Sequence, residues 1–177
     1  SDINFSANFG VEGEAKELKP LRVQQVKNFA LFLLASIGTP MIVMGDELGM
    51  SHRGNNNPWC QNNEINWVNW SEINSEILSF FRELISWRKS HPHFKIESFS
   101  ELDTISWIAQ DNERMLCAHF KGEKGMEDLC VAFNPTDQEE PLKLPPGEWR
   151  CEIATATYRQ GKLAPYSSCL LVGLKTI

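Results

Sequence analysis

Residues 45–67 gather the side chains that could do chemistry on a ligand. Two adjacent carboxylates, Asp46 and Glu47, open the segment, and a long polar stretch rich in asparagine and containing two tryptophans follows. Amide side chains both donate and accept hydrogen bonds toward hydroxyl groups, and an indole face covers the apolar side of a sugar ring. The composition is therefore compatible with a carbohydrate site. A structural loop held together by asparagine turns is the alternative.

The two carboxylates are not expected to act as a catalytic pair. Retaining cleavage of a glycosidic bond needs two carboxyl groups about 5–5.5 Å apart on either side of the bond. Asp46 and Glu47 are expected at the end of a strand, where neighbouring side chains point to opposite faces. We therefore predict no catalytic residue here. One of the two carboxylates is assigned either a hydrogen bond to substrate or a cap on the following loop.

The rest of the loop supplies the other predicted substrate contacts. His52 and Arg53 are able to reach sugar hydroxyls, with an ordinary exposed loop position as the alternative. Three consecutive amides complete the predicted substrate-binding set: Asn55, Asn56 and Asn57. The indoles of Trp59, Trp67 and Trp70 either stack on sugar rings or pack the loop against the elements beneath it.

A helix, a buried strand and a second helix are expected to position this loop. Apolar residues recur at three- and four-residue spacing over 20–37, and Gly38 follows as a stop signal. The continuous apolar run 41–45 does not alternate, which is typical of a strand buried on both faces of a parallel sheet. The periodicity predicts a second helix over 75–90, which ends before Pro92.

The pattern changes after residue 95. Five short strand-like segments follow, separated by turn residues: 104–109, 115–120, 129–134, 149–154 and 168–174. Such spacing predicts a small antiparallel sandwich, and hence two domains, 1–95 and 96–177. Because a parallel strand needs parallel neighbours, the partners of 41–45 are expected upstream of Ser1.

Several short motifs occur in a fixed order within residues 4–95. They read Gly-Val-Glu-Gly-Glu (10–14), Arg22-x-x-Gln25-x-x-Asn28-Phe29, Gly38-Thr39-Pro40-Met41, Gly45-Asp46-Glu47-Leu48-Gly49, Gly54-Asn55-Asn56-Asn57 and Cys60-Gln61-x-Asn63-Glu64-Ile65. In combination they resemble the isoamylase-type glycogen- and starch-debranching enzymes of the α-amylase superfamily, glycoside hydrolase family 13. There is one departure, since that family usually carries Asp where this chain has Asn62.

The resemblance implies an α/β region plus an all-β region: the C-terminal end of a (β/α)8 TIM barrel followed by an antiparallel β-sandwich. Residues 20–37 would be the seventh barrel helix, 41–45 the eighth strand and 75–90 the eighth helix. The implied activity is retaining cleavage of α-1,6 branch linkages in glycogen or a related branched α-glucan. The family's three catalytic carboxylates follow barrel strands four, five and seven, so all three are expected upstream. The chain alone is therefore expected to be inactive.

Composition argues against several other classes of protein. A net charge of -6 leaves no basic stripe for nucleic acid, and the longest apolar run, 29–37, is too short to cross a membrane. Five widely spaced cysteines without a C-x-x-C pair predict buried thiols in a reducing compartment, and we expect a cytoplasmic protein. The first residues lack a signal-peptide pattern, so either the protein is cytosolic or its true N-terminus is missing. Neither a metal nor a cofactor is expected.

Two other functions stay open at this point. One is a non-catalytic glucan-binding or scaffolding relative that kept the debranching fold, and Asn62 is the motive for it. The other is a transglycosylase of the same superfamily. The oligomeric state and the preferred branch length also stay open.

Overall fold

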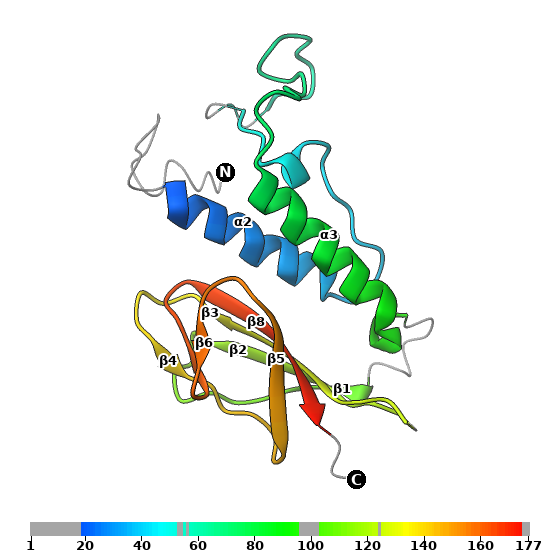
Figure 1. The fold of residues 1–177 in the computed structure, drawn as a ribbon, viewed down its shortest axis with the longest axis vertical. Coiled ribbons are helices and arrows are strands. Elements are labelled where there is room, and N and C mark those ends of the chain that lie inside the picture. The colour runs from blue at the N-terminus through cyan, green and yellow to red at the C-terminus, as the bar shows by residue number, and fades with distance from the viewer. Residues whose placement is uncertain (1–18, 53–54, 56, 96–102, 124, 175–177) are drawn as a thin grey trace.

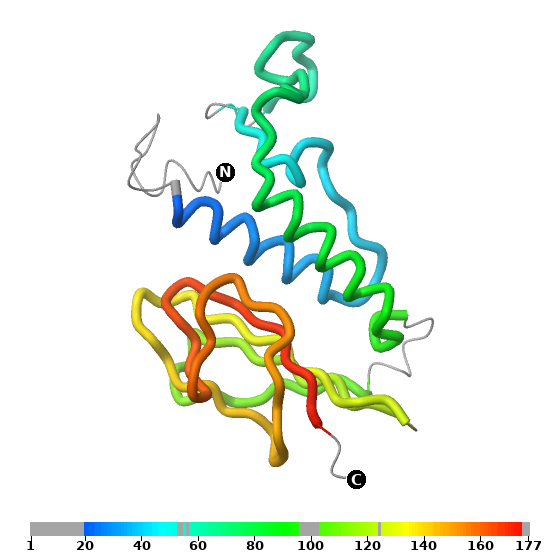
Figure 2. Tube along the Cα trace, in the orientation of Figure 1, coloured from blue at the N-terminus to red at the C-terminus, as the bar shows by residue number. Residues whose placement is uncertain are grey.

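Two long helices lie side by side over one face of a two-sheet β-sandwich (Figures 1 and 2). The helices are α2 (Lys19–Leu34) and α3 (Ser75–Ser90). The computed structural model describes residues 19–52, 55, 57–95, 103–123 and 125–174. In these ranges neither helix has the length and apolarity that crossing a bilayer requires.

Both predicted helices are present, and α3 begins and ends as its sequence indicates. The side-chain oxygen of Asn74 caps the helix by accepting hydrogen bonds from the backbone N–H groups of Glu76 and Ile77, both at 3.1 Å. After Ser90 the chain turns into a short 3-10 helix, η3 (Pro92–Phe94), with proline at its start. The predicted end of α3 before Pro92 is confirmed. The other helix, α2, ends three residues earlier than predicted.

Arg88 on α3 closes the C-terminal end of α2. Its guanidinium donates hydrogen bonds to the backbone carbonyl of Leu34 and, at 2.7 Å each, to those of Ser36 and Gly38. The last turn of a helix leaves carbonyls such as that of Leu34 without a partner, and the arginine satisfies it together with two carbonyls of the segment that follows. Burial lowers the pKa of Arg88, but a guanidinium stays charged at any physiological pH. One charged side chain thus joins the two helices.

The second half of the chain is an antiparallel sandwich, as predicted. Its larger sheet has the strand order β1-β2-β3-β8-β5, with bounds Ile105–Trp107, Leu116–Phe120, Leu129–Asn134, Ser167–Leu174 and Glu148–Ala154. Each neighbouring pair in this sheet runs antiparallel. All five strands match predicted segments, with small shifts at their ends.

The smaller sheet was not predicted. It has the order β4-β7-β6, and its strands are β4 (Glu140–Pro141), β6 (Tyr158–Arg159) and β7 (Lys162–Leu163). Strands of two residues are too short to show the alternation by which a strand is recognised in sequence. They are identified only by their pairing in the folded chain.

The predicted strand over 41–45 is wrong for this structure. The backbone is irregular over 41–43, turns at Met44 and Gly45, and continues into a 3-10 helix, η2 (Asp46–Leu48). The strands of the described residues all lie between residues 105 and 174, and none runs beside this segment. A parallel strand cannot form without hydrogen-bonded neighbours. The apolar side chains are consequently exposed, at 84% for Met41, 65% for Val43 and 71% for Met44.

Two apolar cores lie on opposite faces of the larger sheet. The first fills the space between the helices and the sheet, and its fully buried members include Leu31, Leu84, Leu129, Leu170 and Val172. The second lies between the two sheets, and includes Cys117, Cys130, Leu163, Cys169 and Leu171. Because the helices and the sheet share the first core, the division into domains at residue 95 stays a prediction. Of the remaining cysteines, Cys151 is half-buried and Cys60 is exposed, so the prediction of buried thiols fails at Cys60.

A buried polar cluster around Asn28 fixes α2 on the sheet. The Oδ1 atom of Asn28 accepts hydrogen bonds from Oγ1 of Thr155 at 2.6 Å and from Oγ of Ser168 at 2.8 Å. Its Nδ2 group donates to the carbonyl of Tyr166 at 2.7 Å, as does the amide of Gln24. We call Asn28, Thr155, Ser168 and the Tyr166 carbonyl the Asn28 cluster. Buried polar groups cost free energy unless paired, so this cluster favours one position of α2 on β8.

Candidate functional site

The polar loop, residues 49–74, carries most of the predicted site residues. Its described residues project beyond the helices, away from the sandwich (Figure 1). Its two ends meet at the start of α3, where the backbone N–H of Asn74 donates to the carbonyl of Leu48 at 3.0 Å. Gly49 has φ +70°, and a Cβ atom there would lie 2.8 Å from Cδ1 of Ile77. Glycine is therefore needed at this closing point for both its conformation and its size.

Asp46 and Glu47 lie in η2, not at the end of a strand. The Glu47 carboxylate turns back and accepts a hydrogen bond from the backbone N–H of Gly45 at 3.0 Å. Partial burial raises the pKa of Asp46 and the Glu47 charge adds to this, while a backbone hydrogen bond at Val43 and the charge of His52 oppose it. Consecutive residues of a 3-10 helix point about 120° apart, so the two carboxyl groups diverge. The prediction that this pair is not catalytic now rests on that divergence.

The structure gives the other predicted contact residues different surroundings. His52 is half-buried and close enough to Asp46 for their charges to interact. Asn57 is exposed to solvent. Arg53 and Asn56 lie outside the described residues. The substrate contacts of the whole set stay a prediction.

Asn55 belongs to a network of amides that bond within the loop. Its Nδ2 donates to Oε1 of Gln61 at 2.9 Å, and its Oδ1 accepts from the backbone N–H of Asn57 at 3.0 Å. Asn63 accepts from the backbone N–H of Ile65 at 3.1 Å in the same manner. These bonds hold the loop in shape, which fits the alternative of asparagine turns for these residues.

Asn66 ties the two sides of the loop together. Its Nδ2 donates to the carbonyls of Pro58 at 2.8 Å and Gln61 at 3.0 Å. The backbone N–H groups of Asn66 and Trp67 both donate to the carbonyl of Asn63, at 2.9 and 3.1 Å. Residues 58–67 are therefore joined by hydrogen bonds from both main chain and side chain.

The three tryptophans of the polar loop are exposed, at 83% for Trp59, 59% for Trp67 and 72% for Trp70. Trp67 differs from the others because its Nε1–H donates to Oδ1 of Asn62 at 2.9 Å. A carboxylate at position 62 could accept the same bond, so Asn in place of the Asp that the resemblance implies leaves this interaction intact. The sequence named both residues but not their pairing, since a contact five residues apart depends on the turn between them.

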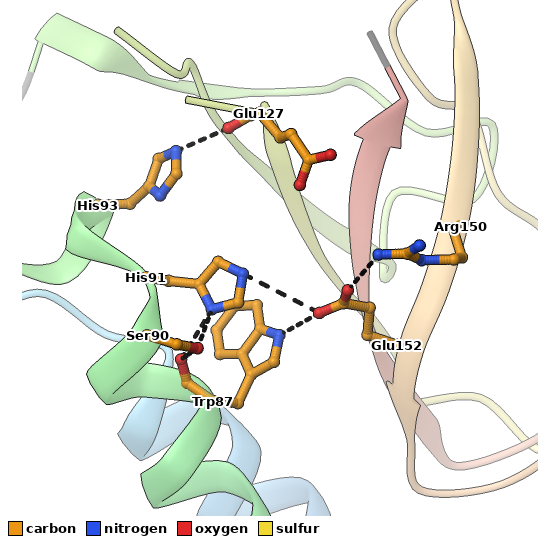
Figure 3. A network of polar contacts seen from close by, with 7 residues as sticks. All are labelled: Trp87, Ser90, His91, His93, Glu127, Arg150 and Glu152. Carbon is orange, nitrogen blue, oxygen red and sulfur yellow. Dashed lines mark hydrogen bonds and ion pairs between the residues drawn. The ribbon is translucent and has the colours of Figure 1, made fainter. Parts of the chain in front are cut away.

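A second cluster of titratable side chains lies between α3 and β5 (Figure 3). The carboxylate of Glu152 accepts hydrogen bonds from Nε1 of Trp87 and from Nη2 of Arg150, both at 2.6 Å. Burial alone would raise the pKa of Glu152, but these two bonds and the charges of Arg150 and His91 hold it below its ordinary value. We call Trp87, His91, Arg150 and Glu152 the Glu152 cluster. Both carboxylate oxygens of Glu152 are engaged by the protein, so the cluster joins the helix to the sheet.

The His91-Pro92-His93 sequence ends α3 and starts η3. The His91 ring stacks on Trp87 with ring centroids 4.1 Å apart, and its Nδ1 lies 2.7 Å from the Trp87 carbonyl. Nε2 of His93 lies 2.8 Å from the carbonyl of Glu127, and burial lowers the pKa of His93. Within the described residues, no group of three or more His, Cys, Asp or Glu side chains could hold a metal ion.

Comparison of the chain with known proteins identifies its family. No family model matches the chain. It is 35% identical over 164 residues to a glycogen debranching enzyme of Dickeya chrysanthemi, a match that covers 85% of this chain and 24% of that protein. It is 30% identical over 191 residues to a glycogen debranching enzyme of Serratia proteamaculans, covering 99% and 29% respectively. The chain belongs to the glycogen-debranching enzyme family.

Further relatives extend the match within that family. The chain is 37% identical over 142 residues to a glycogen operon protein GlgX homolog of Mycobacterium bovis, covering 73% of this chain and 19% of that one. The chain thus spans about a quarter of the length of the curated relatives it matches.

Solved structures share the fold at lower sequence identity. A pullulanase of Anoxybacillus sp. LM18-11 complexed with maltotetraose superimposes with a TM-score of 0.77 at 18% identity, covering 91% of this chain and 25% of that one. A type I pullulanase of Bacillus subtilis str. 168 complexed with maltose gives a TM-score of 0.75 at 18% identity, covering 96% and 25%. This likeness concerns the fold, and it identifies the β-sandwich as one found in pullulanases.

Proposed function

We propose that this chain is part of a glycoside hydrolase that cleaves α-1,6-glucosidic branch linkages of glycogen or a related α-glucan by a retaining mechanism in the cytoplasm. The observation that carries the proposal is the match of 99% of the chain, at 30% identity, to a protein named glycogen debranching enzyme. The maltose and maltotetraose complexes of the structurally similar pullulanases support an α-glucan as the class of substrate.

In this proposal the first half of the chain completes a (β/α)8 barrel. The helix α2 would be the seventh barrel helix, residues 41–45 the eighth strand and α3 the eighth helix. The exposed run from Met41 to Met44 supports this arrangement, because four successive apolar side chains between two packed helices are unusual on a solvent-facing surface. Parallel strands contributed from upstream would cover it. The polar loop would then follow the C-terminal end of a barrel strand, where TIM-barrel enzymes place their active sites.

The roles of the residues follow from that placement. The three catalytic carboxylates would lie upstream, so this chain contributes none and is inactive alone. Its part is to contact the glucan through the polar loop and η2. The residues proposed for this role are Asp46, Glu47, His52, Arg53, Asn55, Asn56 and Asn57.

A chimera tests the proposal most directly. The matching segment of the Dickeya chrysanthemi enzyme would be replaced by this 177-residue chain, and the release of reducing ends measured on glycogen and on a linear α-1,4-glucan. We expect the chimera to cleave glycogen and to leave the linear glucan intact. The isolated chain should release nothing from either substrate.

Two controls make the result decisive. The unaltered Dickeya enzyme gives the reference rate, and the same enzyme lacking the segment shows that the inserted chain is needed. A folded chimera, judged by gel filtration and circular dichroism, that binds glycogen without cleaving it would favour the non-catalytic scaffold. New linkages in place of free reducing ends would favour a transglycosylase.

A further inference from the structure

Trp67 presents its indole in a fixed orientation. The residue is 59% exposed, yet the only polar atom of its ring is already bonded to Oδ1 of Asn62 at 2.9 Å. An indole N–H at a surface is ordinarily satisfied by water, which leaves the ring free to turn. Here the bond holds the edge of the ring, while most of the residue stays exposed to solvent.

The chemistry of the pair decides which atom of Asn62 faces outward. An indole N–H can only donate, so the atom of Asn62 that meets it is the carbonyl oxygen. The Nδ2 group therefore lies on the other arm of the amide. Among the described residues no acceptor pairs with it, and the Asn62 side chain is exposed. The pair thus combines an apolar ring face with a neighbouring pair of N–H donors.

The backbone beneath the pair is held by the loop's own hydrogen bonds. The N–H of Trp67 donates to the carbonyl of Asn63 at 3.1 Å, and Asn66 links this turn to Pro58 and Gln61. Little ordering is then left to occur when a ligand arrives, which lowers the entropic cost of binding. Trp59 and Trp70 are more exposed than Trp67, and no bond to their indole N–H is present in the described residues.

We propose that Asn62 and Trp67 form a binding site for one glucosyl unit of an α-glucan. The indole face covers the apolar side of the pyranose, and Asn62 Nδ2 donates to a ring hydroxyl at its edge. The choice of an α-glucan rests on the proposed function, whereas a sugar unit as ligand follows from the geometry. Asn62 has two roles in this site: its Oδ1 positions the indole, and its Nδ2 contacts the sugar.

The test is a titration of the 177-residue chain with maltoheptaose, measured by isothermal titration calorimetry. Trp67→Ala should weaken binding about tenfold, the loss of roughly 1.4 kcal/mol. Trp67→Phe should lose less, because an aromatic face remains. Trp107→Ala is the matched control, since Trp107 is also exposed, at 68%, but lies on β1 of the sandwich, and its binding should equal that of the unaltered chain.

Asn62 variants separate the two parts of its role. Asn62→Ala removes both the anchor and the donor and should weaken maltoheptaose binding severalfold. Asn62→Asp keeps the anchor, and should therefore weaken binding less than Asn62→Ala. If Trp67→Ala binds maltoheptaose as tightly as the unaltered chain, the proposed site is wrong. It is also wrong if Trp107→Ala loses as much affinity as Trp67→Ala. Equal affinity for cellohexaose, a β-linked glucan, would overturn the α-glucan assignment.

The outcome is independent of the chimera experiment. If maltoheptaose binds through Trp67 while the chimera fails to cleave glycogen, the site stands and the hydrolase proposal falls. If the chimera cleaves glycogen while Trp67→Ala binds maltoheptaose normally, the hydrolase proposal stands and the site falls.

Discussion

The interface between α2 and the sheet and the polar loop both depend on asparagine, but they use it differently. Asn28 is 2% exposed, and its partners Thr155 and Ser168 are 127 and 140 residues away in the chain. The amides of the polar loop are bonded to partners within eight residues. The first arrangement fixes how distant elements meet, and the second fixes only the shape of a local segment.

The difference matters because a buried amide and an exposed amide carry different free energies. Removing a buried partner leaves other polar groups without hydrogen bonds and without water. Removing an exposed partner lets water take its place. Long-range packing should therefore be sensitive to Asn28, whereas the loop can be altered for binding at little cost in stability.

The largest effect is expected for Asn28→Ala. It removes the acceptor Oδ1 from the Thr155 and Ser168 hydroxyls and one of the two donors to the Tyr166 carbonyl, and should lower the free energy of unfolding by about 3 kcal/mol. Chemical denaturation monitored by circular dichroism measures this. The matched control is Asn57→Ala, an exposed asparagine, whose change should stay within about 0.5 kcal/mol. Equal effects of the two substitutions would contradict the contrast between interface and loop.

A smaller effect is expected from Glu152, at the other end of the helix–sheet interface. Its pKa in the folded chain is held below the ordinary value of 4.5, so its contribution to stability is present above that value and is lost as the pH falls through the lowered pKa. Glu152→Gln should cost about 1.5 kcal/mol at pH 7, because it weakens charge-assisted bonds from Trp87 and Arg150.

The pH dependence of unfolding gives the sharper readout for this residue. The difference in stability between the unaltered chain and Glu152→Gln should shrink as the pH is lowered below about 4.5, where the carboxylate takes up a proton. Glu148→Gln, on the same strand but exposed, should show no such difference. If the difference in free energy of unfolding between the unaltered chain and Glu152→Gln stays constant from pH 7 to pH 3, charge plays no part in the Glu152 cluster.

The smallest effect on stability is expected in the polar loop. Asn62→Ala and Asn62→Asp should each change the free energy of unfolding by less than about 0.5 kcal/mol, since the side chain at position 62 is exposed to solvent. The two variants should nevertheless differ in the environment of the Trp67 indole. Fluorine NMR of chain labelled with 5-fluorotryptophan, with the Trp67 signal assigned from Trp67→Phe, should show a shifted signal in Asn62→Ala. The signal should stay near its original position in Asn62→Asp, which keeps an acceptor for the indole.

The sequence by itself determined the elements whose signals are local. The start of α3 after Asn74, its stop at Pro92 and the five longer strands between turn residues are set by residues that are neighbours in the chain, and the structure has all of them. The order of motifs from Arg22 to Ile65 also indicated the debranching family, which the relatives confirm. Such features can be predicted from the sequence because backbone sterics and side-chain periodicity act over a few residues.

Only the tertiary structure decided the features that depend on distant partners. The run 41–45 has the composition of a buried strand, but a strand exists only where neighbours supply its hydrogen bonds, and here the run stays irregular and exposed. The short strands of the smaller sheet, the Asn28 cluster and the Glu152 cluster likewise form only when segments far apart in the chain meet. The bond between Asn62 and Trp67 lies between these cases, because its residues are close in sequence but the turn that joins them is set by the folded loop.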